Sequence, residues 1–176
     1  IVDVQGFFLP SRLAGNTGSK YTPLTPARVL DTRTSGGMVR ALKRNGVVVG
    51  QVPVGSIAVL SNITVTGTQD AGQLTAGSCE SLKAGEQTRS NISFGKNDTF
   101  ANLAVVPLGL VGAKPGFCTV SSVRLNQIVD TQGVFAPSPI GQWGYSAITP
   151  TRLIDTRNCV TKCGQVFKRG AVIKLH

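Results

Sequence analysis

An internal duplication constrains this chain more than any other feature of its sequence. Residues 1–8 read IVDVQGFF and residues 128–135 read IVDTQGVF, while residues 21–33 read YTPLTPARVLDTR and residues 145–157 read YSAITPTRLIDTR. The first two segments are offset by 127 positions and the second two by 124, in the same order. A period of about 125 residues exceeds that of solenoid repeats and predicts a whole domain duplicated in tandem.

The duplication divides the chain into five parts. We expect residues 1–10 to be the last strand of a preceding repeat, 21–135 to be a complete β-domain and 145–176 to open a following repeat, with linkers at 11–20 and 136–144. The flanking parts are too short to bury a core. They are therefore expected to pair with residues outside this chain or with their counterparts in neighbouring molecules. The predicted inter-domain strand comprises Ile1, Val2, Asp3, Val4, Gln5, Gly6, Phe7 and Phe8.

Short apolar runs separated by turn-forming residues indicate an all-β fold. Runs rich in β-branched residues recur at 47–54, 57–66, 102–107, 117–122 and 125–135, and Gly, Pro, Asn or Asp separates nearly all of them. The sequence therefore predicts an antiparallel β-sandwich or a barrel-like domain, repeated in a tandem array. The apolar runs are too short to span a bilayer, so no membrane span is expected in this sequence.

The cysteines indicate disulfide bonds. Three pairings are formally possible for Cys79, Cys118, Cys159 and Cys163. The duplication favours a Cys79–Cys118 bridge, because both residues lie in the complete domain in separate strand regions. It also favours a local Cys159–Cys163 bridge, because the first copy has no cysteine at either matching position. A metal site is the alternative, but a CxxxC spacing with one terminal histidine lacks a second pair of ligands, and no cofactor is expected.

Charged residues recur within the duplicated motifs. Asp31 and Arg33, and likewise Asp155 and Arg157 in the next copy, lie two positions apart. Residues at this spacing share one face of a strand, so we expect structural ion pairs. A calcium or carbohydrate site built on the repeated aspartates is the alternative, although too few carboxylates lie nearby for a dedicated calcium site.

Taken together, the motifs resemble a repeat of large secreted and surface proteins, chiefly of high-GC Gram-positive bacteria. The opening Y-x-x-[LI]-T-P-x-R-[VL]-[LI]-D-T-R and the closing I-V-D-x-Q-G-x-F carry the likeness, and interior segments such as AVLSNITVTG and GQLTAGSCE fit it. The resemblance covers residues 21–135 fully and both flanks in part. It implies a secreted, extracellular β-domain at the cell surface, with no catalytic motif. The even cysteine count agrees with an oxidising compartment.

No catalytic constellation is recognisable, so an enzyme is not expected. The single histidine is His176, and GxSxG, HExxH, P-loop and dinucleotide motifs do not occur. The main hypothesis is a structural building block of an extracellular fibre, stalk or surface layer, assembled through tandem domains and strand complementation between neighbours. Its partners would be copies of itself or adjacent repeats of the same chain.

The competing hypothesis is an adhesin or a module that binds carbohydrate or cell-wall polymer. The net charge of +10 favours anionic partners such as cell-wall polymer or polysaccharide. Nucleic acid is not expected, because basic and aromatic residues are not interleaved. Trp143 and Tyr145, near the second linker, are either ligand contacts that stack on sugars or packing contacts between domains.

Overall fold

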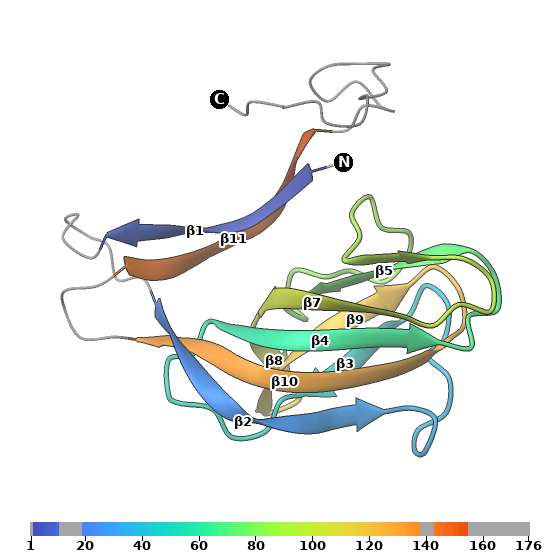
Figure 1. Ribbon diagram of the computed structural model, residues 1–176, viewed down its shortest axis with the longest axis horizontal. Coiled ribbons are helices and arrows are strands. Elements are labelled where there is room, and N and C mark those ends of the chain that lie inside the picture. Colours follow the sequence, from blue (N-terminus) through green and yellow to red (C-terminus); the bar gives the residue numbers. More distant parts are fainter. Residues whose placement is uncertain (1, 11–18, 138–142, 155–176) are drawn as a thin grey trace.

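The chain folds into two layers of antiparallel strands (Figure 1). The computed structural model describes residues 2–10, 19–137 and 143–154. Eleven strands and no helix occur among these described residues, and accordingly none of them forms a helix able to cross a membrane. The prediction of an all-β, antiparallel, sandwich-like fold is confirmed.

Six strands form the larger sheet, in the order β1-β11-β2-β10-β4-β7. Their bounds are β1 Val2–Pro10, β11 Trp143–Ile154, β2 Ser19–Asp31, β10 Asn126–Pro137, β4 Ala58–Thr66 and β7 Phe100–Pro107. The smaller sheet runs β3-β9-β5-β6, and β8 also pairs with β9. Its strands are β3 Arg44–Val48, β9 Lys114–Ser121, β5 Gly72–Gly77, β6 Ile92–Phe94 and β8 Gly109–Val111.

The hydrophobic core lies between the two sheets. Alternate residues of β4 (Val59, Ile63 and Val65) are fully buried, as the two-residue period of a strand requires when one face points inward. Leu74 of β5 and Phe117 of β9 join the same cluster from the opposite sheet. The closing motif contributes Val129 and Val134 to this core, and Leu30 of the opening motif packs against it, so the duplicated motifs are part of the core as well.

The strand predicted at residues 47–54 is shorter than its apolar run. The observed strand, β3, ends at Val48, and the residues beyond it turn. Gly50 and Gly55 adopt left-handed backbone conformations with φ of 91° and 79°, and Pro53 lies between them. A left-handed glycine interrupts the extended backbone that a strand needs, so hydrophobicity alone overestimated this element.

A disulfide links the two chain segments that were expected to carry it. The prediction of a Cys79–Cys118 bridge is confirmed, with the two Cα atoms 4.8 Å apart. Cys118 lies in β9 and Cys79 follows β5, and both are buried with Leu82 and Val120 in a small cluster of their own. The second predicted bridge, Cys159–Cys163, falls outside the described residues.

Removing the disulfide should destabilise the domain substantially. The bridged residues are 39 positions apart, and in the chain-entropy model a loop of that length stabilises by about 3–4 kcal/mol. We expect a Cys79→Ser/Cys118→Ser variant to lose about that free energy of unfolding, measured by urea denaturation without reductant. The matched control is Cys159→Ser/Cys163→Ser, which leaves the buried bridge closed. Equal stability of the first variant and the wild type would contradict the prediction.

Candidate functional site: a duplicated two-strand ribbon

The opening and closing motifs of the complete domain are the two halves of one antiparallel ribbon. We call β2 and β10 the domain ribbon. Within it Tyr21 lies opposite Phe135, and Arg28 lies opposite Asp130. The first and last strands of the domain are therefore neighbours, although about a hundred residues separate them in the sequence.

The flanking strands form a second ribbon of the same design. β1 pairs with β11, and we call this pair the flanking ribbon. All eight of its residue pairs match pairs of the domain ribbon when β1 is shifted by 127 positions and β11 by −124; Phe8 opposite Tyr145, for example, matches Phe135 opposite Tyr21. The expectation that each flank would pair outside this chain is thus wrong for this strand edge, since the two flanks pair with each other.

Both ribbons are irregular at the same places. In the domain ribbon the register shifts between Val129 and Asp130 and between Thr131 and Gly133. The flanking ribbon shifts at the corresponding positions, between Val2 and Asp3 and between Val4 and Gly6. At the second shift the Leu-Thr-Pro part of the opening motif bulges away from its partner, as a proline without an N–H donor favours.

A tyrosine ring lies on a glycine in each ribbon. A Cβ atom at Gly133 would overlap the ring of Tyr21, and a Cβ atom at Gly6 would lie 2.5 Å from the ring of Tyr145. Only glycine leaves room for this close approach, which restores packing at a strand position that has no side chain. This contact gives a physical reason for the glycine of the closing motif and the tyrosine of the opening motif.

A chain of charges follows the domain ribbon. Arg28 donates two hydrogen bonds to Asp130 across the strands, at 2.8 and 3.1 Å, and a weaker one of 3.5 Å to Asp31. Arg33 in turn donates to Asp31 through Nη2 at 2.7 Å and Nε at 2.9 Å. The structure brings Asp31 and Arg33 together as expected, although Arg33 lies in the turn after β2 rather than on the strand.

These contacts change the acidity of the carboxylate. The hydrogen bonds from the Arg33 side chain, followed by that residue's backbone N–H and its charge, lower the pKa of Asp31 from 3.8 to about 2. The hydrogen bond and charge of Asp130 raise the pKa of Arg28. Asp31 therefore remains ionised at any pH near neutral and serves as a fixed acceptor that orders the turn.

A buried polar network closes the same end of the ribbon. Thr32, in the middle of the DTR motif, is buried and accepts a hydrogen bond of 2.8 Å from the backbone N–H of Gln127. The side chain of Gln127 accepts bonds from Thr119 of β9 and Asn45 of β3, at 2.9 and 3.3 Å. The motif thus connects the larger sheet to the smaller one, a role that the sequence did not reveal because threonine and glutamine are common on surfaces.

The two ribbons meet along their opening strands. Tyr145 of β11 pairs with Ser19 at the start of β2, and its ring lies 4.5 Å from that of Phe135. Phe8 adds contacts to Tyr145 and Phe135 at 5.3 and 6.1 Å. Tyr145 is only 4% exposed, and burial raises the pKa of its hydroxyl. Its ring is therefore a packing contact, whereas the side chain of Trp143 is not among those described.

The strand order at this junction is symmetric. Reading along the sheet, a closing strand is followed by two opening strands and then by another closing strand. Tyr145 pairs with Ser19. The duplication relates Tyr145 to Tyr21 and Ser19 to residue 143, and a pair of residue 143 with Tyr21 would fall in the same antiparallel register. Figure 1 shows the flanking ribbon apart from the sandwich, approaching β2 only near the start of that strand. Each ribbon thus meets the other through equivalent strands, as in an isologous contact.

Some predicted site residues cannot be placed. Asp155 and Arg157 lie outside the described residues, as does Ile1. The backbone register sets Asp3 opposite Arg152, the position equivalent to Asp130 opposite Arg28. The cross-strand pair of Arg28 with Asp130 was not foreseen, although both residues are retained in the duplicated motifs, which is the signal that could have indicated it.

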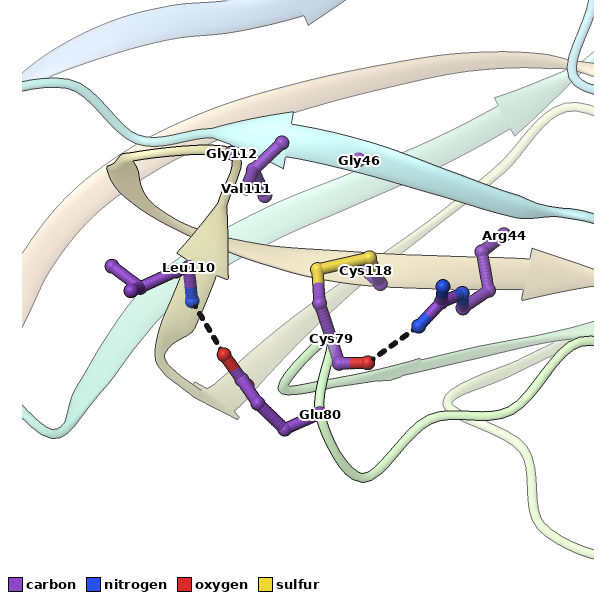
Figure 2. A pocket seen from close by; sticks show the side chains of 8 residues that line it. All are labelled: Arg44, Gly46, Cys79, Glu80, Leu110, Val111, Gly112 and Cys118. Carbon is purple, nitrogen blue, oxygen red and sulfur yellow. Dashed lines mark hydrogen bonds between the residues drawn. A yellow bond between two sulfur atoms is a disulfide. The ribbon is translucent and has the colours of Figure 1, made fainter.

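A hollow of about 480 Å³ beside the disulfide is the other notable surface feature (Figure 2). Glu80 points across it and accepts a hydrogen bond of 2.9 Å from the backbone N–H of Leu110. This bond lowers the pKa of Glu80. Arg44 donates at 2.8 Å to the carbonyl oxygen of Cys79. Both charged groups are thus engaged in holding the loop and strand that frame the hollow.

The two ribbons are related to each other by the chain's own duplication. Comparison with protein-family models, with curated proteins and with solved structures finds no match. Within the described residues, no three His, Cys, Asp or Glu side chains gather where they could hold a metal ion. The repeated interface is the candidate functional feature that the matching registers of the two ribbons define.

Adding a methyl group under the tyrosine should weaken the domain ribbon. We expect Gly133→Ala to lower the free energy of unfolding by about 1–3 kcal/mol, because the new Cβ and the Tyr21 ring compete for one space. In a Tyr21→Ala background the same change should cost much less, which a double-mutant cycle measures. The control is Gly77→Ala, where the nearest atoms would lie 3.8 Å away. Additive effects of the two substitutions would contradict the interpretation.

The ion pairs should make stability depend on acidic pH. The folded state lowers the pKa of Asp31 from 3.8 to about 2. The ionised carboxylate therefore stabilises the fold above pH 3.8, and this stabilisation is lost as the pH falls from 3.8 to about 2. Asp31→Asn should therefore be less stable than wild type near neutral pH, and the difference should shrink as pH approaches about 2. Urea midpoints across this range test it, and Arg33→Ala should behave similarly. A difference independent of pH would show that Asp31 acts through packing instead.

Proposed function

We propose that this protein is a structural building block of an extracellular fibre, stalk or surface layer, in which tandem β-domains are joined by strand pairing between neighbours. One observation carries the proposal: β1 and β11, which the duplication assigns to two different repeats, pair in the register of the domain ribbon. A closing strand from one repeat therefore fits an opening strand from another. Domains with exchangeable ends can be linked through their sheets.

The packing at the junction between the ribbons supports this structural role. Phe135 and Tyr145 are each only 4% exposed, and they are buried with Ala58 at the contact between the ribbons. Aromatic packing of this kind contributes beyond the area that it buries. A junction sealed by aromatic rings and strand pairing holds adjacent units in a fixed relation, as a stalk or fibre requires.

The proposed location is the cell surface or extracellular space. The Cys79–Cys118 disulfide is of a kind that persists in oxidising compartments, and the resemblance of the motifs to surface repeats agrees with it. The net charge of +10 suits a stalk that lies against anionic cell-wall polymer or polysaccharide. Such contact would supplement the structural role, and it is the feature that favours the adhesin alternative.

Electron microscopy of the native material tests this function. We expect negative-stain images to show filaments or strings of beads with an axial repeat of one domain, and a non-reducing gel to show the disulfide-bonded species. The Gly6→Val variant, which places a side chain against the Tyr145 ring of the flanking ribbon, should shorten or abolish these assemblies, whereas the Gly77→Ala control should not. Monodisperse single particles that bind glycans on an array would contradict the structural proposal and favour an adhesin.

A further inference from the structure

β1 and its counterpart β10 occupy different places in the larger sheet. β10 is an interior strand that pairs with β2 on one edge and with β4 on the other. β1 pairs with β11 on the edge equivalent to β2, and it ends the larger sheet in the part of the chain that the structure describes. Among the described strands, none therefore pairs with the edge of β1 that corresponds to the β4 side of β10.

Two aromatic residues on β1 are exposed where their counterparts are buried. Phe7 and Phe8 are 52% and 56% exposed, whereas Val134 and Phe135 at the equivalent positions are 0% and 4% exposed. In the complete domain β4 runs directly beside those buried residues. Large apolar side chains along an open strand edge form a template for pairing with another strand. The greater exposure of Phe7 and Phe8 indicates that the flanking ribbon lacks the neighbouring elements, β4 among them, that surround Val134 and Phe135.

We propose that the open edge of β1 accepts a β4-type strand supplied by a further copy of this repeat. The strand would have the pattern of residues 58–66, AVLSNITVT. By the register of β10 with β4, its Ala58 equivalent would lie opposite Phe8 and its Ser61 equivalent opposite Val4. The flanking ribbon would then be the first part of a second sandwich. This inference rests on the proposed function, which it makes specific for one edge.

The irregularity of β1 favours this occupant. β10 meets β4 with a register shift between Thr131 and Gly133, and β1 carries its own shift at the equivalent place, between Val4 and Gly6. β1 thus already has its irregularity at the position where the pairing of a β4-type strand requires one. The rival occupant is β7 of a second molecule, since β7 forms the opposite edge of the sheet and leaves Phe100 51% exposed. No matching shift occurs in the pairing of β7 with β4.

A peptide-binding experiment tests the inference. A labelled peptide of residues 57–67, with lysine tails for solubility, is titrated with the full chain and followed by fluorescence anisotropy. We expect it to bind at least about tenfold tighter than a scrambled peptide of the same composition. A cysteine cross-link then reads the register: in the Val4→Cys protein, a peptide with Ser61→Cys should form a disulfide efficiently. A peptide with Thr64→Cys should not, and the wild-type chain controls for reaction with its native cysteines.

Each result decides the matter. Selective binding with the cross-link at position 61 supports the β4-type strand. Equal binding of the scrambled peptide, or a cross-link in another register, overturns it. Self-association of the chain that Phe100→Glu abolishes overturns it in favour of pairing between β1 and β7. Filaments in native material without peptide binding would leave the proposed function standing and reject this edge, whereas peptide binding without filaments would do the reverse.

Discussion

The pairing of β2 with β10 is the interaction on which the rest of the structure depends. It joins the two ends of the complete domain, so strands β3 to β9 lie within the loop that it closes. β10 also carries β4 on its other edge and contributes Val129 and Val134 to the core. Because these contacts join residues about a hundred positions apart, the topology has a high contact order. Closing so long a loop costs conformational entropy that the contacts of the folded domain must offset. The Cys79–Cys118 bridge reduces that cost within the interior of the loop.

The duplicated motifs are best understood as the parts of this closure. Gly133 admits the ring of Tyr21, and Asp130 holds Arg28 across the strands. In the DTR segment, Asp31 and Arg33 pair in an exposed turn, while the side chain of Thr32 between them is buried. Each of these contacts needs one residue from the opening motif and one from the closing or neighbouring segment. The residues that recur in the duplicated motifs are therefore residues that contact each other in the fold.

The sequence predicted the fold class, the duplication and the Cys79–Cys118 bridge, because each leaves a local or repeated signal. Alternating residues such as Val59, Ile63 and Val65 indicate that one strand face is buried, but they do not identify the neighbouring strand. The pairing of Tyr145 with Phe8 could not be foreseen for this reason. Gly133 was recognised as part of a motif, but its cause, a ring that packs on it, is a contact over more than a hundred residues. The Asp31–Arg33 pair was expected from spacing alone, and a turn rather than a strand brings its members together.

The equivalence of the two ribbons has a consequence for how such a gene can change. Because β1 pairs with β11 in the register in which β10 pairs with β2, the boundary of a folding unit does not coincide with one fixed stretch of sequence. Recombination between two copies of the motif would add or remove one whole unit and leave each closing strand facing an opening strand. In the proposed tandem array, such an event would change the number of units without a new unpaired edge in the interior of the array.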